Sequence, residues 1–123
     1  MRLLIIILLL ANPTWAHEMT PTYPVWSLAT EARGVLKTSL EIWNRRADVE
    51  YYQVEVFDKE WAPTKFVTED QIIKLGYLQR KSITVYISKN DKKNVTYICT
   101  KSRLLSDNVL SSGVATRICS RVK

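Results

Sequence analysis

The sequence is poor in the residues that build most metal sites and irregular chains. It has one histidine, two cysteines, three glycines and four prolines among 123 residues. So few glycines and prolines exclude collagen-like and low-complexity proteins. Two cysteines cannot complete a tetrahedral zinc site, and one histidine cannot provide both side chains of a copper site that needs two. We therefore expect no metal and no other cofactor.

The remaining composition is typical of a globular domain. Hydrophobic residues make up 46% and charged residues 24% of the chain, and the formal net charge is +6. These fractions argue against disorder. The length fits one compact domain, because domains usually run about 50 to 250 residues.

Long apolar runs are also missing, apart from one at the N-terminus. Arg2 is followed by eight Leu and Ile residues at 3–10 and by a small-residue tail that ends at Ala16. This order predicts a secretory signal peptide, 1–16, and a mature domain, 17–123. A membrane anchor is the alternative, but the run is far shorter than the ~20 residues needed to span a bilayer. We expect a periplasmic or secreted protein with no membrane span in the mature chain.

Export determines how the two cysteines are interpreted. An oxidising compartment favours a disulfide between Cys99 and Cys119. The alternative is two free thiols. Side-chain alternation places Cys119 on the outer face of the last strand, so the expected bridge pins the C-terminal edge of a sheet.

The body of the chain alternates apolar and polar residues with period two, between polar turn clusters. This pattern predicts an all-β protein. About seven strands fit an immunoglobulin-like β-sandwich, with a small barrel as the competing architecture. The expected strands are 23–28 at one edge, 36–44, 51–58, the short pieces 65–67 and 72–75, then 82–88, 95–101 and 114–122.

The order of these strands carries a longer-range pattern. Its segments are Ser39-Leu40-Glu41-Ile42-Trp43-Asn44, 52–58, Phe66-Val67, 72–75, 80–87 and the basic last strand 115–123. Together they resemble the N-terminal domain of periplasmic pilus-assembly chaperones of the PapD type. The resemblance implies an immunoglobulin-like fold and pairing of an edge strand with a partner. In place of the apolar row of those chaperones, the last strand here presents Ala115, Arg117, Cys119 and Arg121.

Basic residues gather around the predicted last hairpin, and we select Lys101, Arg103, Arg117 and Arg121 as candidate partner-binding residues. Such a face suits an acidic protein or an anionic membrane surface. The alternative is a solvated face whose cations protect sheet edges from aggregation. Export and the lack of a binding motif argue against nucleic acid.

Two tryptophans are further candidates for recognition. Trp43 points outward by alternation, and we include it among the partner-binding residues. Trp61, in the Glu60-Trp61-Ala62-Pro63 segment, belongs either to a recognition loop or to a cap on the end of the core.

Catalytic chemistry has little support in the sequence. His17 is expected at a flexible terminus, where no third group orients it, which argues against a His-dependent triad. The carboxylates Glu69 and Asp70, and Glu55 with Asp58, lack the Gly-rich or apolar surroundings typical of a catalytic acid–base pair. We interpret them as loop-solvating groups and the protein as non-enzymatic.

These observations favour an exported protein-binding module. We expect it to contact another envelope or surface-assembly protein through an edge strand, either 23–28 or 115–122, with a basic face selecting the partner. The alternative is a permanent structural subunit of a secretion, conjugation or phage-encoded envelope assembly. A small exported enzyme is a third interpretation.

Overall fold

The computed structural model describes residues 16–103 and 115–123. The predicted signal peptide falls almost wholly outside the described residues, as does most of the polar connection expected before the last strand. Among the described residues, no helix is both long and apolar enough to cross a membrane.

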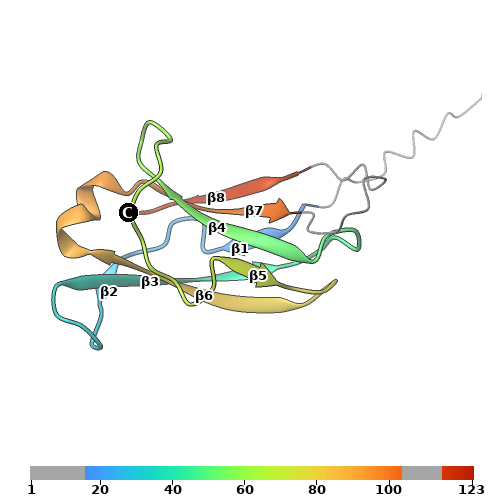
Figure 1. Ribbon diagram of the computed structural model, residues 1–123, viewed down its shortest axis with the longest axis horizontal. Helices are drawn as coiled ribbons and strands as arrows, with labels where there is room; N and C mark the ends of the chain where they lie inside the picture. Colours follow the sequence, from blue (N-terminus) through green and yellow to red (C-terminus); the bar gives the residue numbers. More distant parts are fainter. Residues whose placement is uncertain (1–15, 104–114) are drawn as a thin grey trace, which may run out of the picture.

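Two antiparallel sheets pack face to face (Figure 1). In the first sheet, β3 (Val35–Trp43) pairs with β6 (Arg80–Ser88) on one side and with β1 (Glu18–Thr20) and β2 (Ser27–Leu28) on the other. The second sheet has the order β5 (Ile72–Lys74), β4 (Tyr51–Phe57), β7 (Tyr97–Arg103) and β8 (Arg117–Arg121). A short 3₁₀-helix, η1 (Lys89–Asn94), joins β6 to β7. The predicted all-β sandwich is confirmed, and the barrel alternative is wrong.

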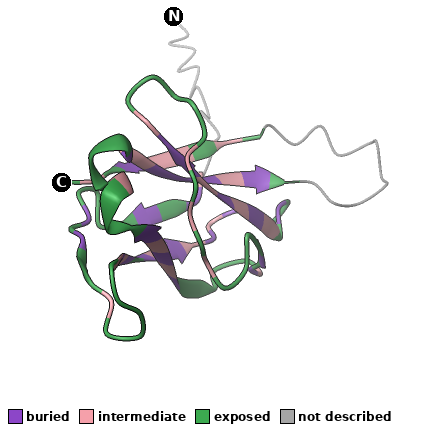
Figure 2. Ribbon diagram, turned by 60° about the vertical axis from the view of Figure 1, so that its left-hand side comes forward, coloured by how far each residue is buried: buried purple, intermediate pink, exposed green. Residues whose placement is uncertain are grey.

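The core lies between the sheets, where period-two alternation brings apolar side chains together (Figure 2). Leu40 and Ile42 of β3 point inward, as predicted, and Val85 of β6 lies beside them. Burying each such side chain stabilises the fold by about 1.5–3 kcal/mol. The inward side chains of the opposite sheet are Tyr52, Val54, Val56, Ile73 and Ile98.

The strand expected at 23–28 is wrong in its extent. The chain instead pairs with β3 twice, at β1 and β2, and leaves that sheet between them. The carbonyl oxygens of Thr22 and Pro24 there accept hydrogen bonds from the amides of Arg121 and Lys123. Prolines at 21 and 24 lack the N–H that a continuous ladder needs, which explains the interruption.

The piece expected at 65–67 is also reduced. It makes only an isolated bridge, in which Val67 pairs with Tyr86 on the outer edge of β6. The polar turn expected at 90–94 is the 3₁₀-helix η1, and the Ser88 hydroxyl accepts a hydrogen bond from the amide of Asn90 at its start. None of its side chains is buried, so the sequence has no apolar periodicity there that would distinguish a 3₁₀-helix from a turn.

Asn44, the residue that follows β3, holds one end of the sandwich together. Its fully buried side chain donates from Nδ2 to the carbonyl oxygens of Val49 (2.7 Å) and Leu75 (2.8 Å). Its Oδ1 accepts from the amide of Arg46 (2.9 Å) and from the hydroxyl of Tyr52. Two donors and two acceptor positions are therefore all used. One amide thus joins three segments of the chain.

A disulfide joins Cys99 of β7 to Cys119 of β8, the pair predicted from the sequence. The two residues are direct cross-strand partners, and β8 is the edge of its sheet. Closing a loop across 20 residues is worth about 3 kcal/mol in the chain-entropy account. The side chains lie on the face that points away from the core, although neighbouring groups cover Cys99 completely.

Candidate functional site: the basic face and edge of the second sheet

The outer face of the second sheet brings together four of the five residues selected from the sequence. Lys101 and Arg103 alternate outward on β7, and Arg117 and Arg121 do so on β8. The register places Lys101 directly opposite Arg117, and places Tyr97 opposite Arg121. Lys74 of β5 joins the same face through its pairing with Tyr51.

Local contacts offset only part of this positive charge. The Arg117 guanidinium donates to both carboxylate oxygens of Glu55, at 3.0 and 3.4 Å, and lies 5.3 Å from the ring centre of Phe57. Arg103 donates to the side-chain oxygen of Gln53. Among the described residues, no salt bridge involves Lys101 or Arg121. One carboxylate therefore stands among five cations, which gives this face a positive potential.

Trp43, the fifth residue selected, is not part of this face. It belongs to β3 in the other sheet, opposite Arg80 of β6 in register. Two guanidinium groups lie over its indole, with the ring centre 4.2 Å from Cζ of Arg80 and 4.9 Å from Cζ of Arg45. The indole is thus already a cation–π acceptor within the molecule.

The edge of β8 is only partly hydrogen-bonded. Alternation in an antiparallel pair points the backbone groups of Arg117, Cys119 and Arg121 away from β7. Arg121 and Lys123 donate to the carbonyl oxygens of the 22–24 segment, at 3.0 and 3.1 Å. Within the described chain, Arg117 and Cys119 make no backbone hydrogen bond on that side, since β1 beside them pairs with β3. The described residues therefore provide no hydrogen-bond partner for the outward backbone groups in the first half of β8.

The expectation of a flexible His17 is wrong. Its ring is buried against Tyr52, with Nε2 2.7 Å from Oγ1 and 3.1 Å from the carbonyl oxygen of Thr100. The Thr116 hydroxyl lies 3.5 Å from Nδ1. Burial, with a smaller contribution from the Arg46 charge, lowers the pKa of His17 to about 4. The imidazole is thus a neutral structural group, which short-range sequence patterns could not reveal.

Arg46 extends this buried polar cluster. Its guanidinium binds both carboxylate oxygens of Asp48, at 3.0 and 2.6 Å, and lies 3.5 Å from the hydroxyls of Ser102 and Thr116. The hydrogen bond to Arg46 lowers the pKa of Asp48, and burial raises the pKa of Tyr52 to about 12. The sequence signal was weak, because Asn44-Arg45-Arg46-Ala47-Asp48 has the composition of an exposed turn.

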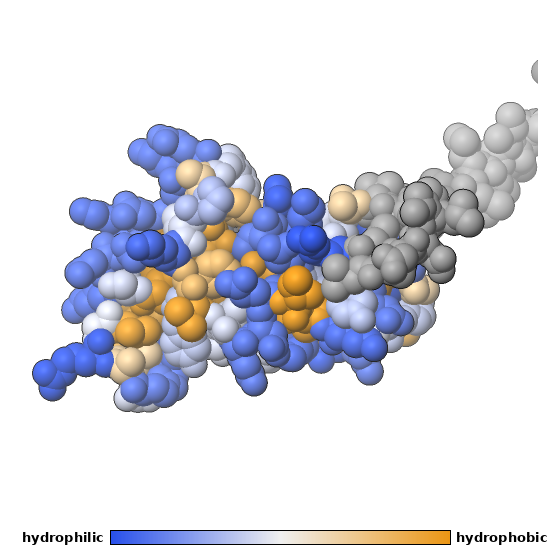
Figure 3. Space-filling model, viewed as in Figure 1, coloured by the Kyte–Doolittle hydropathy of each residue, from blue (hydrophilic) through white to orange (hydrophobic). Residues whose placement is uncertain are grey.

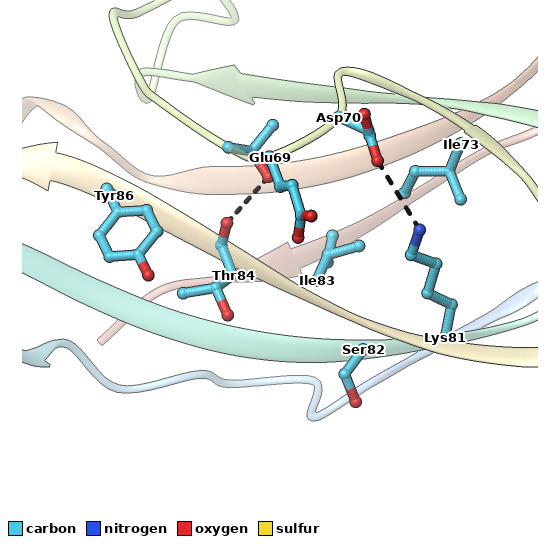
Figure 4. A pocket seen from close by; sticks show the side chains of 9 residues that line it. Glu69, Asp70, Ile73, Lys81, Ser82, Ile83, Thr84 and Tyr86 are labelled. Atoms are coloured by element: carbon cyan, nitrogen blue, oxygen red, sulfur yellow. Dashed lines mark hydrogen bonds and ion pairs between the residues drawn. The ribbon is translucent and has the colours of Figure 1, made fainter.

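Two hollows among the described residues lie away from the basic face. A cavity of about 120 Å³ beside β6 and the 68–70 segment has Ile73 and Ile83 in its wall. There Lys81 pairs with Asp70 across 3.8 Å (Figure 4). The predicted carboxylate pair thus contributes to an exposed ion pair.

A second, larger hollow of about 410 Å³ lies at the other end of β6 and is lined partly by Phe66 and Val67. Figure 3 shows apolar patches over the 65–67 segment and over β5. The most exposed apolar side chains there are Val67 (66%) and Ile72 (45%). The described residues include no cluster of His, Cys, Asp and Glu that could hold a metal ion.

Comparison with known proteins relates this chain to a chaperone by its fold. No family of known proteins matches the sequence, and no curated protein does. Among solved structures, the periplasmic chaperone SfaE superimposes with a TM-score of 0.55 over 88% of this chain. The two proteins share a fold. Their sequence identity is 11%, and this chain spans 56% of the chaperone's length. The PapD-type resemblance therefore holds as a distant relationship of fold.

Proposed function

We propose that this chain is an exported, non-enzymatic binding module that contacts another envelope or surface-assembly protein through β8 and the basic face beside it. The outward backbone groups of Arg117 and Cys119, which have no hydrogen-bond partner in the described part of the chain, carry the proposal, because an unpaired edge is a template for an added strand. The fold shared with a periplasmic chaperone supports it.

In the proposed mechanism, backbone and side chains have different roles. An extended segment of the partner adds to β8 and forms hydrogen bonds with Arg117 and Cys119. Lys101, Arg103 and Arg121 favour an acidic partner and accelerate its approach. The disulfide holds β8 to β7, so the edge keeps its geometry when the partner binds.

Two substitutions at one position separate these roles. Arg117→Ala removes the side chain and keeps the outward amide, whereas Arg117→Pro removes both. Neither change removes a hydrogen bond to β7, because Lys101 and Arg117 form a non-hydrogen-bonded pair. We expect Arg117→Pro to bind the native partner about tenfold more weakly than Arg117→Ala. Titration of the co-purified partner measures this, with circular dichroism as the folding control.

Charge reversal tests the basic face separately. The double variant Arg117→Glu and Arg121→Glu is expected to lose the partner in co-purification from the native host, while Lys92→Glu on η1 retains it. Unchanged recovery with the double variant would contradict the proposal. An assembly that cannot be dissociated in size-exclusion chromatography would instead favour a permanent structural subunit.

Export is the remaining part of the proposal. The 1–16 segment would direct secretion, and 17–123 would form the mature domain in an oxidising compartment. N-terminal sequencing of the exported protein is expected to begin at His17. Recovery of the folded protein only in the cytoplasm, with Met1 retained, would contradict it.

A further inference from the structure

The loop at 58–62 is a hydrogen-bonded turn beside the basic face. Asp58 Oδ1 accepts hydrogen bonds from the amides of Glu60 (2.8 Å) and Ala62 (2.9 Å), and the Asp58 amide donates to the Ala62 carbonyl (3.0 Å). The Trp61 amide donates to the Asp58 carbonyl (3.1 Å). In Figure 1 this loop, which follows β4, stands out from the sheet near the end of β8.

The turn holds Trp61 in an unfavourable backbone conformation and an exposed position. Its φ of 64° lies in the left-handed region, which a bulky residue rarely adopts. The indole stacks on Tyr97, with ring centres 4.1 Å apart and planes within 4°, and lies 5.8 Å from Phe57. Half of Trp61 nevertheless remains exposed. Strained residues of this kind cluster at functional sites.

The stacked rings lie next to the cationic side chain of Arg121. Tyr97 and Arg121 are cross-strand partners, so the Trp61 platform adjoins Arg121, for which no salt bridge is found in the described chain. The charges of Lys59 and Glu60 on the loop offset each other. Tryptophan, tyrosine and arginine are the residue types that dominate binding hot spots.

We propose that Trp61, Tyr97 and Arg121 form the main contact for an acidic, extended segment of the partner protein. This inference rests on the proposed function and specifies its partner. Strands lie about 4.8 Å apart and an extended chain advances about 3.3 Å per residue. A partner strand added beside β8 lies two strand spacings from β7, so about three further residues of the partner span that distance. There an apolar side chain covers the indole, and a carboxylate pairs with Arg121.

The test uses the full chain and random peptides on a display library, followed by titration of the selected peptides as synthetic probes. We expect the selected peptides to be rich in Asp and Glu. Trp61→Ala and Arg121→Glu should each weaken binding at least about tenfold. Trp43→Ala is the matched control on the other sheet, and Lys92→Glu is the control for charge; both should stay within about twofold.

Each other outcome overturns the inference in a recognisable way. Peptides without acidic residues, or equal binding by Trp61→Ala, would contradict it. If Arg117→Pro still weakens the same peptides, the proposed function survives that failure; if no β8 variant affects them, both fail. Dextran sulfate is the second probe. Trp61-dependent binding of this polyanion in place of the peptides would assign the platform to an anionic glycan and overturn the peptide proposal.

Discussion

At one end of β7 and β8, the side chains of His17 and Arg46 are buried, and both lie within hydrogen-bond distance of the Thr116 hydroxyl. At the other end, Trp61 stacks on Tyr97 with half of its surface in solvent. The first end places polar groups where an apolar core would be expected. The second exposes the kind of ring that usually fills a core. Each end reverses the ordinary distribution of polar and apolar groups.

The two ends differ in how completely their side chains are partnered within the chain. At the polar end, buried donors and acceptors have partners within the chain, so the cluster is structural. At the aromatic end, the backbone is strained and the ring is only half covered, so part of its surface remains open to contact. The comparison predicts that changes at the polar end reduce stability and changes at the aromatic end reduce binding.

The largest effect is expected at Asn44. Replacing it with Ala leaves the carbonyls of Val49 and Leu75 and the hydroxyl of Tyr52 without their buried partner. Each such loss costs about 1–3 kcal/mol, so the free energy of unfolding should fall by about 4 kcal/mol. Urea unfolding followed by tryptophan fluorescence measures this. Asn90→Ala on the exposed η1 is the matched control, and a similar small loss in both variants would contradict the structural role.

The next effect is a pH dependence set by His17. Its pKa is about 4 in the folded protein against 6.5 for an ordinary histidine, so the unfolded chain binds the proton first as pH falls. The free energy of unfolding is therefore highest above pH 6.5 and decreases as the pH falls from about 6.5 to about 4. The total decrease is about 3 kcal/mol.

His17→Gln isolates this contribution, because the carboxylates remain in both proteins. Urea unfolding at several pH values should show the decrease in the native protein and a much flatter profile in the variant over the same window. Parallel profiles would show that His17 titrates normally and is not held at the polar end.

The smallest effect is expected at Trp61. Replacing it with Ala should change the free energy of unfolding by less than about 1 kcal/mol, since the ring is half exposed. Trp26→Ala is the matched comparison, because Trp26 lies in the core and its loss should cost about 3–5 kcal/mol. Thermal unfolding of both variants checks the contrast. Equal losses would make Trp61 a cap on the core and remove the distinction between the two ends.

Several parts of the fold follow from local patterns. Alternation in 36–44 and 82–88 predicted the inward faces of β3 and β6, because a half-buried strand repeats every two residues. The same alternation failed near the N-terminus, where the chain changes sheets between β1 and β2. A change of sheet depends on which distant strand offers backbone partners, and no local period records that.

The candidate site shows the same division. Spacing along the last two strands predicted that Lys101, Arg103, Arg117 and Arg121 share one region, because hairpin neighbours are close in sequence. Trp43 was grouped with them on exposure alone, and it lies on the other sheet. The sequence allows two interpretations of Trp61, a recognition loop or a cap on the core. Its stacking on Tyr97 depends on the path of the 58–62 loop, which no local pattern predicts.

The sequence by itself determined the longer strands, the basic last hairpin and the pairing of its two cysteines, because periodicity, charge and oxidation chemistry act over short distances. Only the tertiary structure decided that His17 and Arg46 are buried, that half of the β8 edge is covered, and that Trp61 is exposed. The physical reason is the same in each case. Burial and hydrogen-bond satisfaction depend on segments far apart in the chain, and only folding brings those segments together.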